Sequence, residues 1–145
     1  MEISRAVASL LQEDIVSVES GATVSAVVRI MVEKSVRNVF VMRKEGEPVG
    51  LVRDWDIVRR LVAPNLNPAA VKVDEIMCAP VASVNADAEL SEIAARMAET
   101  GARRLLVVLD GKLIGTITAG SLLNIVSHFP DKSTHEILRS IAGLA

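Results

Sequence analysis

The sequence is poor in aromatic residues and in residues that form covalent or metal cross-links. Of its 145 residues, 2% are aromatic, with two Phe, one Trp and no Tyr. Single-stranded nucleic acids bind largely by stacking their bases on aromatic rings, so this composition disfavours a single-strand binding groove. One Cys excludes an intrachain disulfide, and with only two His it leaves no cluster for a structural zinc. We therefore expect no metal site.

An excess of one charge and long apolar runs are also missing. Sixteen Lys and Arg stand against eighteen Asp and Glu, a net charge of −2, so no overall positive field attracts nucleic acid or anionic lipid. A local group, Arg53, Arg59 and Arg60, is the one alternative for nucleic acid. Apolar stretches such as residues 105–109 are far shorter than the roughly 20 residues that span a bilayer. The first residues do not resemble a signal peptide. We expect a cytoplasmic protein with no membrane contact.

An internal repeat organises the chain, half of whose residues are hydrophobic. Subtracting positions gives an offset of 66 through the first part of each copy, and the offset falls to 65 within a predicted hairpin tip, where one residue is lost. The pairs at offset 66 include Ser17 with Ser83, Met31 with Met97, Arg37 with Arg103 and Val41 with Val107; those at offset 65 are Gly46 with Gly111 and Gly50 with Gly115.

Both copies change periodicity in the same order. The first predicts a strand at 15–18, a helix capped by Thr23, strands at 39–42 and 49–52, and a helix from Asp54 that Pro64 ends. The second predicts, in the same order, a strand at 81–84, a helix at 89–100, strands at 105–109 and 112–117, and a helix at 120–127. The expected fold is α/β (α+β), with two tandem β-α-β-β-α repeats packed through their sheets.

The remaining segments set the expected domain boundaries. Pro64 and Pro68 mark a linker, and residues 69–77 are expected to form a helical lead-in to the second repeat, as 3–11 do for the first. We therefore predict a first repeat with its N-terminal helix over 1–66 and a second over 67–130. A C-terminal helical tail is expected over 131–145, with Ile137, Leu138 and Ile141 on one face.

The ordered set of motifs, present twice, resembles the cystathionine-β-synthase (CBS) domain family, whose tandem pairs form a Bateman module. The second copy carries it most fully, in the run from Thr100 through the basic pair Arg103-Arg104 to Thr118. The resemblance implies a regulatory, non-enzymatic module. It would bind an adenosyl nucleotide such as AMP, ADP or ATP in the cleft between the repeats and signal to a protein partner in trans. An S-adenosylmethionine sensor is the alternative ligand class, and no obligatory cofactor is implied.

The family's Gly-apolar-x-Thr/Ser-x-x-Asp element is half kept in each copy. The first copy, from Gly50, keeps the ribose acid as Asp56 but has Arg53 where a hydroxyl is expected. The second keeps Thr118 but has Ser121 in place of the acid. A carboxylate can accept both ribose hydroxyls, and its hydrogen bonds are roughly twice as strong as those of a neutral acceptor, so we prefer the site around Asp56. Arg53 could pair a phosphate, or its bulk could fill the pocket.

Further contacts are implied by the resemblance at matching positions. Arg104, Arg103 and Arg37 would reach phosphate groups, and the adenine would be flanked by residues that enter the first strand of each unit, namely Ile15 and Val16 or Pro80 and Val81. Ordinary structural roles compete with each assignment. Asp56, Thr118 and Ser121 also suit helix capping, and Arg103 and Arg104 also suit a solvated strand end.

The resemblance also implies a homodimer. Its apolar faces are expected on the last helix of each copy, at Ile57, Val58, Leu61, Leu122, Leu123 and Val126. Cys78 reads as a small buried apolar side chain, and Trp55 as a packing or subunit-contact residue. The competing hypothesis is a structural dimerisation or partner-docking module whose nucleotide sites have degenerated, which the departures at Arg53 and Ser121 favour.

Overall fold

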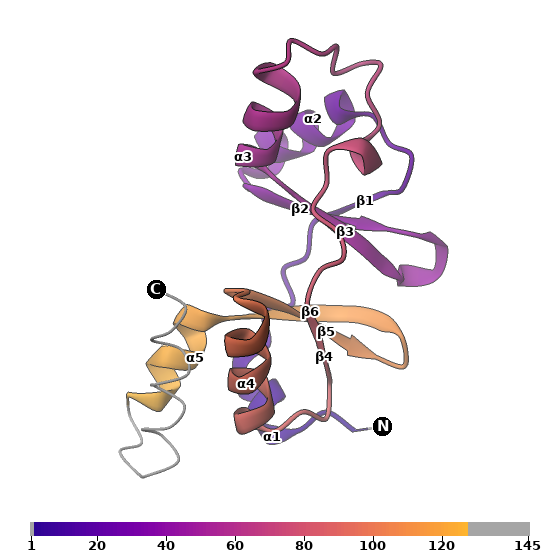
Figure 1. Cartoon of the computed structure of the whole chain (residues 1–145). Coiled ribbons are helices and arrows are strands. Elements are labelled where there is room, and N and C mark those ends of the chain that lie inside the picture. The colour runs from indigo at the N-terminus through magenta and orange to yellow at the C-terminus, as the bar shows by residue number, and fades with distance from the viewer. Residues whose placement is uncertain (1, 128–145) are drawn as a thin grey trace. The chain divides into compact units, whose positions relative to one another are not determined.

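Each repeat forms one three-stranded mixed sheet in the computed structural model, which describes residues 2–127 (Figure 1). In both sheets the first strand lies parallel to the middle strand, which is antiparallel to the third. The strands are β1 (Ser17–Glu19), β2 (Asn38–Met42) and β3 (Pro48–Arg53) in the first sheet, and β4 (Ser83–Asn85), β5 (Arg104–Leu109) and β6 (Lys112–Thr118) in the second. The predicted mixed α/β class is confirmed. The predicted tail over 131–145 lies outside the described residues.

The helices follow the predicted order. Thr23 caps α2 (Val24–Lys34) by accepting a hydrogen bond from the Ala26 amide, as the sequence predicts. The helix from Asp54 is confirmed in extent, but only α3 (Asp54–Ile57) is α-helical, and Val58–Val62 (η2) form a wider π-helical turn. The other helical elements are α1 (Arg5–Leu10), η1 (Lys44–Gly46), η3 (Val73–Glu75), α4 (Leu90–Thr100) and α5 (Ala119–Val126).

The compact units differ from the predicted boundaries because the two lead-in segments are exchanged. Residues 15–81 form one unit, which we call the first-repeat unit, and 2–14 with 82–127 form the other, the second-repeat unit. Figure 1 shows α1 packed with the elements of the second repeat. The lead-in residues 2–14 therefore belong to the second-repeat unit, and the lead-in residues 67–81 belong to the first-repeat unit.

Apolar side chains of the lead-ins explain the exchange. Val7 and Leu10 are buried in the core of the second-repeat unit, while Val73 and Ile76 are buried in that of the first. Isolated backbone bridges join each lead-in to the third strand of the sheet it covers, Gln12 to Thr116 and Leu51 to Cys78. Burying each of these side chains contributes about 1.5 to 3 kcal/mol, so each lead-in is part of the core that it covers.

The predicted helix over residues 69–77 is wrong. Only η3 is helical there, because backbone groups of the preceding residues are hydrogen-bonded to the first repeat, which prevents a continuous helix. The Val24 amide donates to the Val71 carbonyl, and the Val73 amide donates to the Ala22 carbonyl. Hydrophobic periodicity reflects only residues that are close in the sequence, so it does not predict hydrogen bonds between residues 71–73 and residues 22–24.

Two motif glycines are required by the lead-ins. A Cβ on Gly115 would lie 2.6 Å from the Gln12 carbonyl oxygen, so a side chain there would force the lead-in backbone away from the strand. A Cβ on Gly50 would collide with the Met77 side chain and would lie 3.1 Å from the Cys78 carbonyl oxygen, which is a tight contact with the lead-in backbone. The glycines that begin the two motifs are therefore explained by close backbone packing.

The exchange predicts which fragment folds. A fragment of residues 15–81 keeps Val73, Ile76 and the bridge to Cys78, so we expect it to unfold cooperatively on heating in circular dichroism. A fragment of residues 1–66 follows the sequence repeat but lacks all three, and we expect no cooperative transition. A fragment 1–66 that melts as cooperatively as 15–81 would contradict the exchange.

Candidate functional site

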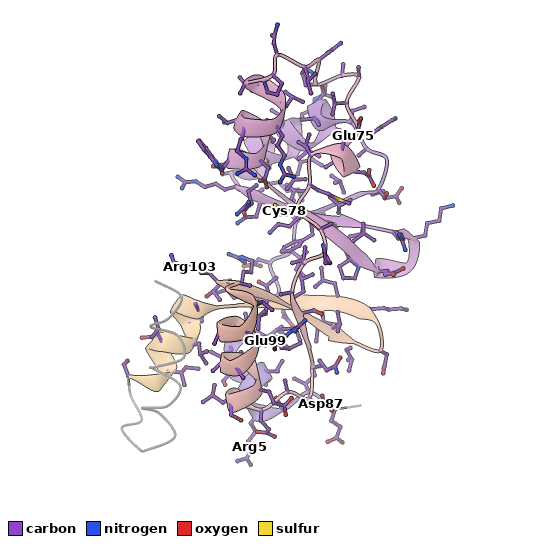
Figure 2. All side chains as sticks on the ribbon, viewed as in Figure 1. Arg5, Glu75, Cys78, Asp87, Glu99 and Arg103 are labelled. Carbon is purple, nitrogen blue, oxygen red and sulfur yellow. The ribbon has the colours of Figure 1, made fainter. Side chains whose placement is uncertain are left out.

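Both half-motifs lie where the third strand of a sheet ends and a helix begins. In the first-repeat unit the Asp54 amide donates to the Arg37 carbonyl at 3.0 Å, and in the second-repeat unit the Ala119 amide donates to the Arg103 carbonyl at 2.8 Å. Figure 2 shows Arg103 at the end of its sheet beside the start of α5. The structure thus brings Arg37 to the junction that holds Arg53 and Asp56, and Arg103 to the junction that holds Thr118 and Ser121.

Asp56 is fully buried, and its carboxylate is clamped by Arg53. Asp56 Oδ2 accepts hydrogen bonds from the Arg53 amide at 2.9 Å and from Arg53 Nε at 3.0 Å, and Oδ1 accepts from Nη2 at 3.0 Å. The Asp56 side chain is 0% exposed, whereas that of Arg53 is 45% exposed. The guanidinium therefore covers the carboxylate and presents its other side to solvent.

Cys78 is the third member of this cluster, and it is not the purely apolar side chain that the sequence indicated. Arg53 Nη2 lies 3.3 Å from Cys78 Sγ, and Sγ lies 3.6 and 3.7 Å from the two carboxylate oxygens of Asp56. Figure 2 shows Cys78 on the lead-in that runs beside the first-repeat sheet. A thiol donor adds a weak hydrogen bond to the buried carboxylate.

The ion pair determines the charge state of the cluster. Burial opposes ionisation of Asp56, but the side-chain and backbone hydrogen bonds from Arg53 outweigh it and hold the pKa of this carboxyl below its usual value. The hydrogen bond to Asp56 raises the pKa of the Arg53 guanidinium above its usual value. At neutral pH the cluster is therefore a carboxylate paired with a guanidinium.

The second-repeat junction is uncharged at the corresponding positions. Thr118 caps α5 by accepting from the Ser121 amide at 3.2 Å, and its hydroxyl donates to Ser121 Oγ at 2.9 Å. Gln12 Nε2 donates to the same Ser121 oxygen at 3.2 Å. Capping thus accounts for Thr118 and places Ser121 within a small network of neutral groups.

Gln12 and Cys78 are site residues that sequence reasoning missed. Each lies on a lead-in and contacts the residue at the last position of the motif in its unit. Gln12 contacts Ser121, and Cys78 contacts Asp56. Gln12 and Cys78 are 66 positions apart, which is the offset of the repeat, so extending the repeat backwards from Ser17 and Ser83 would have paired them. The exchange of lead-ins hid which motif each one reaches.

The other predicted site residues are placed as follows. Arg104 is half-buried and donates through Nη1 to Thr116 Oγ1 at 3.0 Å, so this guanidinium is partly engaged within its own sheet. Arg37 and Arg103 have exposed side chains. Ile15 and Val16 precede β1, and the Val16 carbonyl accepts from Phe40; Pro80 and Val81 precede β4. Contact of these four with an adenine remains a prediction.

The chain belongs to the CBS domain family. The family model for the CBS domain matches residues 7–63 and 73–128. Each matched segment therefore begins on a lead-in, at Val7 or Val73, and includes the side chain that packs on the sheet of the other repeat.

A curated protein and a solved CBS domain structure are similar to this chain. An uncharacterised protein of Methanopyrus kandleri is 31% identical over 123 residues, which are 84% of this chain and 63% of that protein, so the chain spans less than two thirds of that relative. A conserved CBS domain protein of unknown function from Thermoplasma acidophilum is 28% identical with a TM-score of 0.66, covering 93% of this chain and 75% of that one.

A second similar structure contains a nucleotide. The cytosolic domain of the Mg²⁺ channel MgtE, crystallised in complex with ATP, is 26% identical with a TM-score of 0.68, covering 80% of this chain and 46% of that one.

Within residues 2–127 the structure shows neither a cluster of metal-ligating side chains nor a membrane-spanning helix. No group of three or more His, Cys, Asp or Glu in that range is arranged to hold a metal ion. None of the helices in the described part of the chain is long and apolar enough to cross a membrane.

The lowered pKa of Asp56 predicts a pH-dependent contribution to stability. The ionised carboxylate stabilises the folded state fully above its ordinary pKa, and this contribution is lost as the pH falls through the lower pKa of the folded state. We expect wild type to exceed Asp56→Asn by about 2 kcal/mol in free energy of unfolding near neutral pH. The difference should shrink below about pH 4.

Urea unfolding of both proteins at several pH values tests this. Asp74, whose pKa is lowered by the Ser20 hydrogen bond against the effect of burial, is present in both proteins and cancels in the difference. A difference that stays constant between neutral pH and about pH 3 would show that the Asp56 pair is not ionic.

Proposed function

We propose that the chain is a regulatory ligand-binding module that takes an adenine nucleotide, AMP, ADP or ATP, at the Asp56 junction. CBS domain pairs are commonly regulatory ligand-binding modules, and the similar MgtE domain was crystallised with ATP. The ligand would act by binding two conformations with different affinities, and coupling of about 1 to 3 kcal/mol is typical of such switches. The signal would pass to a partner protein, and no catalytic step is involved.

The observation that carries this proposal is the juxtaposition of Asp56 and Arg53. A nucleotide offers ribose hydroxyls, which donate to a carboxylate, and phosphate oxygens, which accept from a guanidinium in a bidentate manner. Arg53 and Asp56 supply both groups within one turn, and the exposed side of Arg53 leaves it accessible to an anion. S-adenosylmethionine has the ribose but no phosphate, so it is the weaker candidate here.

A structural docking module is the second candidate function. The Asp56 carboxylate already receives three hydrogen bonds from Arg53, and the equivalent acid is absent at Ser121. A site of this kind is what degeneration of a nucleotide pocket would leave.

Self-association is compatible with either function. The predicted dimer faces need correction, because Ile57, Leu61 and Leu122 are buried in the cores of their own units. Among the described side chains, the large apolar ones that are exposed are Val28, Val32, Trp55, Val58, Val62 and Leu66 in the first-repeat unit and Ile3 and Leu123 in the second. The side chain of Val126 lies outside those that the structure describes. Sedimentation velocity over a range of concentrations tests the homodimer, and a monomer throughout would exclude it.

Thermal melting with added ligand tests the nucleotide proposal. A ligand that binds only the folded state at one hundred times its Kd adds about 2.7 kcal/mol of stability, so AMP, ADP or ATP should raise the melting temperature of wild type by several degrees. Asp56→Ala should lose most of the shift, whereas Asp54→Ala, two residues away and exposed, should keep it. No shift with any nucleotide at millimolar concentration would favour the docking module.

A further inference from the structure

We propose that Arg53 is a gate that makes the Asp56 site selective for phosphorylated nucleotides over the corresponding nucleoside. This inference rests on the proposed binding of nucleotide at Asp56. It assigns to Arg53 two positions: one on Asp56 when the site is empty, and one on the phosphate of the ligand when it is filled.

A ligand can reach Asp56 only if the Arg53 guanidinium first moves away from the carboxylate. The two carboxylate oxygens of Asp56 receive three N–H groups of Arg53, and the carboxylate has no exposed surface. A ribose hydroxyl can reach these oxygens only after the guanidinium has turned away. The Arg53 amide stays in place because it belongs to the backbone of β3, and the backbone of Cys78 is held beside that strand by its bridge to Leu51.

The chemistry of the ligand decides whether this movement is favourable. When Arg53 leaves, the hydrogen bonds between the guanidinium and the carboxylate are lost, and hydrogen bonds to charged groups are among the strong ones in proteins. Ribose hydroxyls replace the donors to Asp56, but a neutral nucleoside gives the guanidinium no anionic partner. A phosphate replaces it with bidentate hydrogen bonds of the same kind. Only a phosphorylated ligand therefore restores the partners of both charged groups.

The second-repeat unit supplies the substitution that removes the gate. Thr118 occupies the position equivalent to Arg53, and its hydroxyl caps the following helix without covering a carboxylate. Arg53→Thr thus places in the first-repeat unit a residue that the same fold already accepts at that position. Arg59→Ala is the matched control, since it removes one positive charge from an exposed position of η2.

Isothermal titration of adenosine and AMP into wild type, Arg53→Thr and Arg59→Ala tests the gate. We expect Arg53→Thr to bind adenosine about tenfold more tightly than wild type does, because the buried carboxylate is now available to the ribose. AMP should gain less, since it loses its phosphate partner. Arg59→Ala should match wild type with both ligands.

The outcomes separate the gate from the proposed function. If AMP binds and Arg53→Thr leaves the affinity for adenosine unchanged, Arg53 is at most a phosphate ligand and the gate is wrong, while nucleotide binding stands. If neither ligand binds any of the three proteins, nucleotide binding at Asp56 fails and the gate fails with it.

A measurement on wild type covers the case in which Arg53→Thr does not fold. The Arg53 Nε–H group, which donates to Asp56, gives a side-chain ¹⁵N resonance that Arg53→Lys would identify by its loss. Saturating AMP should move this resonance. A resonance that stays unchanged in the AMP-saturated protein would overturn the gate.

Discussion

The buried Asp56 carboxylate needs a cation and hydrogen-bond donors, and the neighbouring residues have to supply them. An ionised group in the interior is strongly destabilising unless charged or hydrogen-bonding partners replace its water. Arg53 at the end of β3 provides the cation, its own amide provides a third donor, and Cys78 reaches the carboxylate from the lead-in. The same residues that satisfy the fold are those that a nucleotide would have to use, so stability and ligand binding compete for one carboxylate.

The exchange of lead-ins extends this dependence to the whole chain. Cys78 reaches Asp56, and Gln12 reaches Ser121, only because each lead-in crosses the third strand of a sheet beside a glycine. Each repeat therefore obtains part of its core and one contact of its junction from outside its own sequence.

The sequence predicted the elements more completely than it predicted their partners. Apolar periodicity, glycine turns and the caps at Thr23 and Thr118 are local signals. Each kind of signal occurs in both copies of the repeat, which strengthens the prediction of the elements. The contact between Cys78 and Asp56 joins residues 22 positions apart, and that between Gln12 and Ser121 joins residues 109 apart, so no local pattern encodes them. Leu61 shows the same limit, because an apolar helix face looks alike whether it packs on its own sheet or on a second subunit.

The most direct measurement is a crystal structure of the chain grown with AMP. The account predicts the ribose hydroxyls on the Asp56 carboxylate, with the Arg53 guanidinium turned onto the phosphate and Cys78 still beside Asp56. AMP bound at another place, with the hydrogen bonds between Arg53 and Asp56 intact, would contradict it.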